Sequence, residues 1–524
     1  MNSKTTNDHS YINYLQNLLE TVSSETLDKV YYIIDQTSWD EPNNTSDWNN
    51  IAVVAMTEAE QSEDLTMRSM YLEIAFDALN NGLEIDRNPI LAAHLALINS
   101  WVGEKNQALE IAYNAFINAV HYAYNTSEKN QSYLIFLSIK HQKIVINDQK
   151  ILEQVLSENI FQQVLVLLSQ IICTSQIAFY NTANQRFLDL ANQTLPNLTN
   201  LNLKLGISNL IAGQIEGILY LQQARKLQPD SSSILQSLYL AYRDLKQIPI
   251  ADYWLKQASE FYQNNSSDLQ WQWTQLPLDS SFTYLPFEND ITIAVEPSLK
   301  SIVTSVLLAE QDWFEKEMEF WRSYIKPGMT VIDVGANVGV YTFSAALKVG
   351  NTGQVFAIEP FSGCVNCLQE TCRINNLSWV KVCAGAASDK NSTIKLLLHT
   401  ANELNEVITD NTMEIPVGSF EEVPCFTLDS LIEKENIQQV DFLKMDAEGH
   451  EMAVLSGGKK LINQFKPVIL YENIAGSQGS NIGVAQYLEN IGYQLFYYQP
   501  FIQQLIPVNS PENYQQLNFI AVPQ

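Results

Sequence analysis

A strand, a glycine-containing turn and a helix are predicted in direct succession between residues 330 and 347. Residues 330–334 form a short apolar run typical of a buried strand, and residues 340–347 have a helical pattern. Gly335 and Gly339 stand between them, where glycine permits a tight turn and close approach of a ligand. This order of elements begins the βαβ unit of doubly wound nucleotide-binding folds. The sequence therefore predicts an α/β domain with a ligand at this turn.

The turn departs from the G-x-G-x-x-G pattern of dinucleotide-binding proteins, because the middle glycine is absent. Asp333, at the end of the strand, would repel a pyrophosphate. It suits a ligand with an ammonium group and a sulfonium centre, as in S-adenosylmethionine. Glu359 follows the next predicted strand, residues 354–358, at the place where doubly wound folds present a carboxylate to ribose hydroxyls. The alternative for Glu359 is capping of the next helix, for which Ser362 is the better placed residue.

Acidic residues also follow two later predicted strands, residues 440–445 and 467–471. The polar residues after these strands are Asp446, Glu448, His450, Glu472 and Asn473. Ligands of open α/β sheets bind outside the carboxyl ends of the strands. Carboxylates gathered at one edge repel one another, which is unfavourable unless the edge is a site. We therefore predict the functional site at this edge.

Residues 301–524 resemble the FkbM-type methyltransferase family. The matching segments are 310–315, 333–339, 356–360, 427–431, 441–451 and 518–522. The resemblance implies a Rossmann-like methyltransferase fold, an α/β domain whose mostly parallel sheet has an antiparallel last strand. It also implies S-adenosyl-L-methionine as the cofactor and, usually, methylation of an oxygen atom.

The cofactor is expected to lie against the glycine turn. The residues assigned to it are Asp333, Gly335, Asn337, Gly339, Glu359, Asp389 and Asp446. Asp333 would orient the ammonium group, directly or through water, and Glu359 would accept hydrogen bonds from both ribose hydroxyls. Asp389 follows the strand predicted at 380–383 and by position resembles the residue near the adenine amine. A plain turn aspartate is the alternative for Asp389.

Methyl transfer to an alcohol needs a base or a metal, because the hydroxyl is a weak acid. The residues assigned to catalysis are Asp446, Glu448, His450 and Glu472. Asp446, Glu472 and Asn473 are alternative ligands for Mg²⁺, which prefers oxygen donors. Glu448 and Glu451 could instead stabilise the start of the following helix, predicted at 451–465. His450 on its own is more often an exposed helix residue than a base.

Residues 11–262 show helical periodicity rather than strand alternation. Residues 217–224 match residues 251–258, 34 positions later, and residues 108–115 have the same spacing of alanines. The period resembles tetratricopeptide repeats, which pair antiparallel helices. A helical repeat either presents a groove to a protein partner or packs on its neighbouring domain. We expect an all-α tetratricopeptide-like domain over residues 1–275 and the α/β domain over residues 276–524.

The net charge of −28 disfavours nucleic acids and anionic membranes as partners. No stretch is apolar over the length that a transmembrane helix needs, and the first 20 residues do not resemble a signal peptide. With six cysteines, the cytoplasm is the expected location. Cys364, Cys367 and Cys372 could bind zinc, but three small buried side chains on one helix face are the favoured interpretation.

The sequence leaves three functions open. The favoured one is O-methylation of a sugar, a glycan or another small-molecule hydroxyl. The second is methylation of a protein or peptide that the helical repeats capture. The third is an interaction scaffold with an inactive methyltransferase fold. The third is disfavoured because each expected strand-end carboxylate is present.

Overall fold

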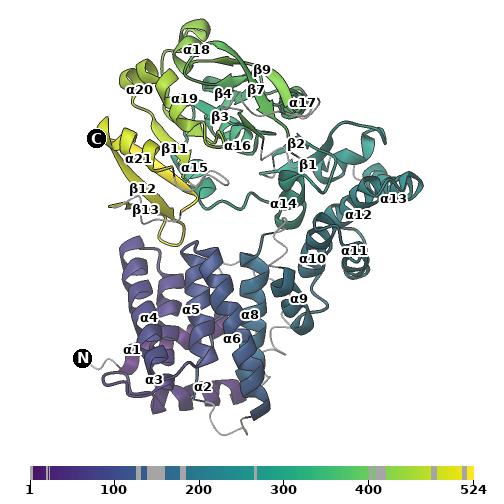
Figure 1. The fold of residues 1–524 in the computed structure, drawn as a ribbon. Helices are drawn as coiled ribbons and strands as arrows, with labels where there is room; N and C mark the ends of the chain where they lie inside the picture. Colours follow the sequence, from purple (N-terminus) through teal and green to yellow (C-terminus); the bar gives the residue numbers. More distant parts are fainter. Residues whose placement is uncertain are drawn as a thin grey trace. The chain divides into compact units, whose positions relative to one another are not determined.

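The computed structural model describes most of the chain and divides it into two compact units (Figure 1). The described residues are 4–18, 22, 24–125, 132–137, 160–177, 185–264, 268–288, 290–399, 405–407, 420–473, 481–509 and 516–524. Unit 1 comprises Met1–Pro229 with Pro500–Gln503, and unit 2 comprises Asp230–Gln499 with Gln504–Gln524. The predicted domain limit near residue 275 separates the all-α domain from the α/β domain. It differs in kind from the division into compact units and stays a prediction. Residues 265–267, close to this limit, lie outside the described residues.

Helices form the secondary structure of the described part of unit 1. They are α1 (Lys4–Leu18), α2 (Ser24–Gln36), α3 (Thr45–Gln61), α4 (Leu65–Ile85), α5 (Pro89–Trp101), α6 (Lys105–Asn125), α8 (Ile160–Ser175), α9 (Gln185–Thr194), α10 (Thr199–Ile211) and α11 (Gly217–Leu227). Asn44, Asp64 and Asn88 begin α3, α4 and α5 by accepting hydrogen bonds from first-turn amides. Consecutive helices pack in pairs, as α3 with α4 and α5 with α6 (Figure 1). Within the described residues, none of the helices has the length and apolar character needed to cross a membrane.

The close approach of α10 and α11 depends on two glycines. A β-carbon on Gly217 would lie 2.5 Å from the carbonyl oxygen of Gly206, and one on Gly206 would lie 2.5 Å from a methyl group of Leu221. The two matching sequence segments lie in α11 and in α13 (Ile248–Asn264), and each of these helices pairs with the helix before it. The all-α paired-helix architecture is thus confirmed. Its tetratricopeptide character stays a prediction.

Unit 2 contains helices and three sheets. Its helices are α12 (Ser232–Asp244), α13, the 3-10 helix η1 (Leu269–Gln275), α14 (Ile302–Glu310), α15 (Glu317–Tyr324), α16 (Val340–Val349), the 3-10 helix η2 (Gly350–Thr352), α17 (Ser362–Asn375), α18 (Leu428–Glu435), α19 (Glu451–Gly457), α20 (Lys459–Phe465) and α21 (Ile482–Asn490). Its strands are β1 (Thr283–Phe287), β2 (Ile291–Val295), β3 (Thr330–Val334), β4 (Gln354–Glu359), β5 (Val380–Ala384), β6 (Ala386–Ala387), β7 (Ser392–Leu397), β8 (Glu406–Val407), β9 (Phe420–Phe426), β10 (Phe442–Met445), β11 (Val468–Glu472), β12 (Tyr493–Gln499), β13 (Gln504–Pro507) and β14 (Asn518–Pro523).

The main sheet has eight strands in the order β13-β12-β14-β11-β10-β3-β4-β5. The strands from β11 to β5 pair in parallel, whereas β14 is antiparallel to both β11 and β12. This topology confirms the Rossmann-like methyltransferase fold with an antiparallel last strand. In the register, Lys444 of β10 lies opposite Asp333 of β3, so both acid-bearing strands end at the same edge.

The two faces of the main sheet are covered by different helices. Leu443 and Met445 point into the core that α18, α19, α20 and α21 complete. Phe442 points to the opposite face, since side chains alternate along a strand. Its ring lies 4.8 Å from that of Trp321 in α15. Lys444 points to the same face as Phe442, because the two residues are two positions apart in the strand. A charged side chain therefore lies on this face, close to the carboxyl end of β10.

Two local predictions were wrong. The helix predicted over 451–465 is interrupted at Gly458, which separates α19 from α20. Ser362 does not cap α17, because its hydroxyl donates to Oε1 of Glu421 at 2.9 Å.

Two cysteines of α17, Cys364 and Cys367, are packed as small apolar residues, whereas Cys372 is half-buried. Cys364 is 0% exposed and Cys367 is 2% exposed. Within the described part of the chain, the group of histidine, cysteine and acidic residues that could hold a metal ion lies elsewhere and contains no cysteine.

Candidate functional site

The turn between β3 and α16 has a backbone that requires glycine at its first position. Gly335 has a φ of 74° and Asn337 a φ of 50°, both in the left-handed region. A β-carbon on Gly335 would lie 1.7 Å from the carbonyl oxygen of Asp446. The side-chain oxygen of Asn337 accepts a hydrogen bond from the amide of Val338 at 2.6 Å. The turn therefore lies directly against the segment that follows β10.

Glu359 ends β4 and ties that strand to the glycine turn. Its Oε2 accepts from the amide of Asn337 and its Oε1 from the amide of Phe361, both at 2.8 Å. Its residue is 6% exposed, and burial raises the pKa of Glu359 to about 7 although both amides oppose the shift. Each oxygen keeps a second lone pair, so the carboxylate can still accept a hydrogen bond from a ligand hydroxyl.

Asp333 is completely buried and belongs to a charged group beneath the edge. Its Oδ2 accepts from the hydroxyl of Thr342 at 2.6 Å, and its Oδ1 lies 3.8 Å from Nζ of Lys444. The same Nζ lies 3.0 Å from Oδ2 of Asp446 and 4.7 Å from the centre of the Tyr341 ring. Burial lowers the pKa of Lys444, but the neighbouring acids, Asp446 first, outweigh it and hold the pKa above its usual range. Burial raises the pKa of Asp333 despite the ammonium group.

Sequence reasoning missed Lys444, although a signal was present. A lysine inside an apolar strand has to be buried with a partner if both faces of the sheet are covered. The acids on either side of it in space, Asp333 and Asp446, were both singled out. Lys444, whose ammonium group lies between them, was not singled out.

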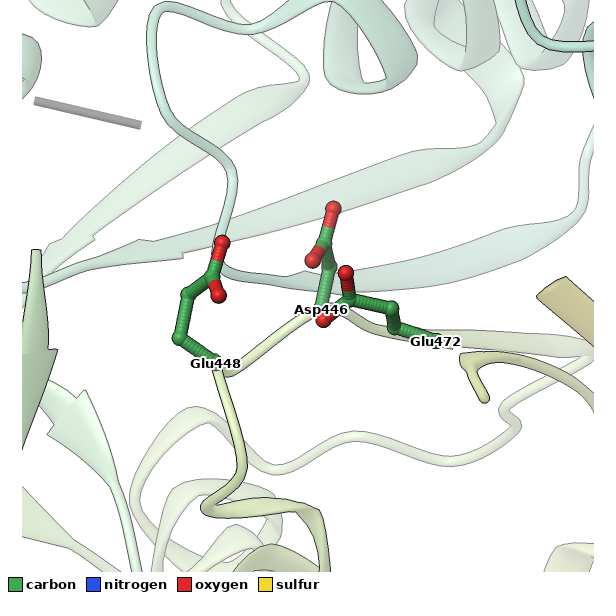
Figure 2. Close-up of side chains that lie close together, drawn as sticks. All are labelled: Asp446, Glu448 and Glu472. Carbon is green, nitrogen blue, oxygen red and sulfur yellow. The ribbon is translucent and has the colours of Figure 1, made fainter. Parts of the chain in front are cut away.

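Three carboxylates meet above this group. Asp446 and Glu448 follow β10, and Glu472 ends β11. Figure 2 shows their three side chains close together. One oxygen of each lies within 4.8 Å of the others. Glu448 points into the group from a left-handed backbone with a φ of 49°. The structure thus brings together three of the four residues assigned to catalysis.

The pKa of Glu472 is strongly raised. Burial, followed by the charges of Asp446, Glu448 and Glu451, raises the pKa of Glu472 to about 10. The side chain therefore carries a proton at neutral pH. Its Oε2 is buried and has no hydrogen-bond partner among the described residues. A ligand or an ion in this place would satisfy it.

Asn473 lies beside the carboxylates in sequence but has another role in the structure. Its residue is 0% exposed, and its Nδ2 donates to the carbonyl oxygen of Gln516 at 3.0 Å. Glu448, which was not among the suggested magnesium ligands, offers an oxygen atom within 4.8 Å of those of Asp446 and Glu472, and the role of Asn473 as a ligand stays a prediction.

His450 is half-buried at the residue before α19, so the expectation of an exposed helix residue was wrong. Its Nε2 lies 2.9 Å from Oγ of Ser388, and that hydroxyl lies 3.3 Å from Oδ1 of Asp389. Burial lowers the pKa of His450, and the charge of Asp389 opposes this shift. The imidazole is thus neutral at pH 7 and joined to the loop after β6. Asp389 itself is exposed, and its contact with adenine stays a prediction.

Glu315 brings a further, half-buried acid to this edge. Tyr341 donates its hydroxyl to Oε2 of Glu315 at 2.7 Å, and Nδ2 of Asn518 donates to the same oxygen at 3.0 Å. Burial, and then the charge of Asp446, raises the pKa of Glu315. The segment before α15 is thereby fastened to α16 and to β14. No function was assigned to Glu315 from the sequence.

Comparison with known proteins gives a family for this part of the chain. Residues 333–495 match the family model described as Methyltransferase FkbM domain. No curated protein matched the chain.

Several solved structures are similar to the chain. A methyltransferase FkbM from Methylobacillus flagellatus is 17% identical, with a TM-score of 0.26, over 42% of this chain and 54% of that one. A SAM-dependent methyltransferase from Aquifex aeolicus is 17% identical, with a TM-score of 0.23, over 40% and 87%. An O-methyltransferase from Bacillus cereus in complex with SAH is 16% identical, with a TM-score of 0.25, over 40% and 82%. The chain spans about half the length of the first of these proteins.

Proposed function

Because residues 333–495 match the family model of the methyltransferase FkbM domain, we propose that the protein transfers the methyl group of S-adenosylmethionine to a hydroxyl oxygen of a sugar, a glycan or another small molecule. The observation that carries this proposal is the position of Asp446, Glu448 and Glu472. These carboxylates meet at the carboxyl edge of the sheet, and Asp446 lies directly against the glycine turn.

The residues at the edge fit the cofactor. Gly335 lets the turn lie directly against the carbonyl oxygen of Asp446, and Glu359 keeps lone pairs for the ribose hydroxyls. The sulfonium centre carries a positive charge, which the carboxylates beside the turn would attract. Asp333 is buried behind Thr342 and Lys444, so its effect on the ammonium group would be electrostatic or relayed rather than a direct contact.

The acceptor must lose a proton when its oxygen takes the methyl group. In this in-line displacement the carbon–sulfur bond breaks while the carbon–oxygen bond forms, and a carboxylate removes the hydroxyl proton. Asp446 is the candidate base, since the ammonium group of Lys444 fixes its orientation at 3.0 Å. Glu472 carries its own proton at neutral pH, so it would donate a hydrogen bond to the acceptor. An anionic acceptor would be repelled here, which favours a neutral hydroxyl compound.

A magnesium ion also fits the three carboxylates. Asp446, Glu448 and Glu472 offer oxygen atoms within 4.8 Å of one another, and the unsatisfied Oε2 of Glu472 belongs to this set. A bound Mg²⁺ would lower the pKa of the acceptor hydroxyl. The chain would then need to release the proton of Glu472 to the solvent.

Calorimetric titration of the full chain with S-adenosylmethionine, S-adenosylhomocysteine and NAD tests the cofactor. Binding of the first two without NAD is expected, and NAD binding alone would refute the proposal. The formation of S-adenosylhomocysteine is then followed with a panel of neutral sugars, their phosphorylated counterparts and a peptide mixture. Turnover of the neutral sugars is expected, whereas turnover of the peptides alone would overturn the acceptor class. Repeating the assay with EDTA and with added Mg²⁺ decides whether the ion takes part.

A further inference from the structure

Glu451 is a buried carboxylate that contacts the proposed site without belonging to the three carboxylates. Its residue is 0% exposed, and its Oε1 accepts hydrogen bonds from the amides of Ala447 at 2.8 Å and Gly449 at 3.3 Å. Between these two amides stands Glu448, whose backbone is left-handed, as is that of Gly449. A left-handed backbone is unfavourable for glutamate and persists where the surroundings fix it. Glu451 thus holds the turn that directs Glu448 toward Asp446.

Asn481 connects this turn to the neighbouring strand end. It stands at the residue before α21, where an asparagine commonly caps its own helix, but its side chain makes no such bond. Its Nδ2 donates instead to Oε2 of Glu451 at 2.7 Å and to the carbonyl oxygen of Glu472 at 3.3 Å. Its own amide donates to the carbonyl oxygen of Asn473 at 2.6 Å.

The two side chains therefore form a bridge between the elements that carry the three carboxylates. Asp446 and Glu448 depend on the turn that Glu451 holds, and Glu472 depends on the strand end that Asn481 holds. An acidic residue in a first helical turn favours its helix even when it is exposed to solvent. Glu451 is instead fully buried, next to other acids, and both of its oxygens are used outside its helix.

We propose that Glu451 and Asn481 are positioning residues for methyl transfer, which fix Asp446, Glu448 and Glu472 at the mutual distances that the reaction needs. This role rests on the proposed function. It differs from plain stabilisation of α19 because it acts on the acceptor side of the site. None of the hydrogen bonds that Glu451 and Asn481 make among the described residues goes to Gly335 or Glu359, which form the cofactor side.

Asp429 provides a matched control in the same unit. It lies in the first turn of α18, and its carboxylate accepts from the amides of Lys460 at 3.0 Å and Leu461 at 2.9 Å at the start of α20. Asp429→Asn therefore removes a carboxylate that holds a helix start, as Glu451→Gln does, but at a place that carries none of the three carboxylates.

The test compares Glu451→Gln, Asn481→Ala and Asp429→Asn with the unmodified full chain. Hydrogen exchange followed by mass spectrometry reports on the amides of residues 446–451. We expect exchange there to become about tenfold faster in the first two variants and to stay unchanged in Asp429→Asn. With the acceptor that the unmodified enzyme methylates, kcat should fall by about 10-fold to 100-fold in the first two variants. The Kd of S-adenosylhomocysteine should stay within about twofold.

A double variant, in which the donor and the acceptor of the hydrogen bond between residues 451 and 481 are exchanged, tests whether this hydrogen bond itself is needed. In Glu451→Gln combined with Asn481→Asp, the new amide can donate to the new carboxylate, so the hydrogen bond is restored in reverse. We expect kcat to recover at least about threefold over Glu451→Gln alone, which a loss of general stability would not produce.

Results that differ from these expectations would contradict either the positioning role or the proposed function. Unchanged exchange and unchanged kcat in Glu451→Gln would overturn the positioning role, and so would an equal loss of kcat in Asp429→Asn. If the unmodified chain bound no S-adenosylhomocysteine, the proposed function would fail. The exchange data would still decide whether the bridge holds the turn.

Discussion

Replacing Lys444 by methionine removes the ammonium group that lies between Asp333 and Asp446. At an effective dielectric constant of 20, charges 3.0 Å and 3.8 Å apart attract one another by about 5 and about 4 kcal/mol. The desolvation of the three groups offsets much of this attraction. Removing one member of a buried pair typically destabilises the fold by about 3–5 kcal/mol, and we expect Lys444→Met to fall in this range at pH 8.

The destabilisation should depend on pH. Burial already raises the pKa of Asp333 in the presence of the ammonium group, and its removal will raise that pKa further. The native state of the variant then holds this proton more tightly than the unfolded chain, whose aspartate titrates near pH 4. Stability is therefore lost as the pH rises from about 4 through the raised pKa. The cost of Lys444→Met at pH 5 should be lower than at pH 8 by at least about 1 kcal/mol.

Calorimetric unfolding at both pH values measures these quantities. Lys381→Met is the matched control, since Lys381 lies on β5 in the same sheet and its side chain is 52% exposed in an ion pair with Glu435. That variant should lose less than about 1 kcal/mol at either pH. Adding Asp333→Asn to Lys444→Met removes the uncompensated charge and should restore at least about half of the lost stability. An equal cost at pH 5 and pH 8, with no recovery in the double variant, would refute the electrostatic reasoning.

Three further predictions concern the cofactor side and the carboxylates. Gly335→Ala should destabilise the protein by about 2–4 kcal/mol and abolish binding of S-adenosylhomocysteine in calorimetry, because its β-carbon would lie 1.7 Å from the carbonyl oxygen of Asp446. Glu359→Ala should weaken that binding by about 1–3 kcal/mol, and an unchanged affinity would mean that the ribose contact is misassigned. Glu472 has a pKa raised to about 10, so the native chain loses stability as the pH rises above the unfolded value near 4.5. Between pH 6 and pH 8, the free energy of unfolding of Glu472→Gln should therefore fall by up to about 2–3 kcal/mol less than that of the unmodified chain. An equal dependence of the free energy of unfolding on pH in the two proteins would contradict this prediction.

The order of the elements in unit 2 could be predicted because each strand and turn has a local signature. The strands β3, β4 and β5 are short, mostly apolar runs. A glycine follows β3 and β5, and β4 ends with an acid. The prediction that acids meet at one edge needed only the rule that parallel strands end together. It was right for Asp446 and Glu472, since both follow neighbouring strands of the main sheet.

The mutual contacts of these acids could not be predicted in the same way. Glu448 joins the group because its backbone is left-handed, which glutamate rarely is, and no local pattern announces this conformation. Asn473 was suggested as a ligand because it follows a strand-end acid, and no local pattern indicates that its Nδ2 donates to Gln516 in a distant part of the chain. Asn481 was not considered, because its hydrogen bond to Glu451 joins residues 30 positions apart.

The helical part of the chain, which extends into unit 2, likewise has features that are local in the sequence and features that are not. The 34-residue spacing located α11 and α13 because small residues recur where paired helices touch. Capping residues such as Asn44 and Asp64 mark where helices begin. What a helical surface binds depends on the side chains that different helices bring together, and periodicity gives no information on that arrangement.

The electrostatics of the sheet edge connects these findings. Lys444 supplies one positive charge, whereas Asp333 and Asp446 lie beside it and Glu315 adds a further acid from the segment before α15. Glu448 lies near Asp446. The chain limits the repulsion by keeping a proton on Glu472 and by giving Glu451 and Glu359 to backbone amides. A ligand with positive charge, such as a sulfonium centre or a divalent cation, would relieve the repulsion that remains among the acids at this edge. The same repulsion opposes a phosphorylated acceptor, so the charge that would hold the methyl donor would also restrict the acceptor to neutral hydroxyl compounds.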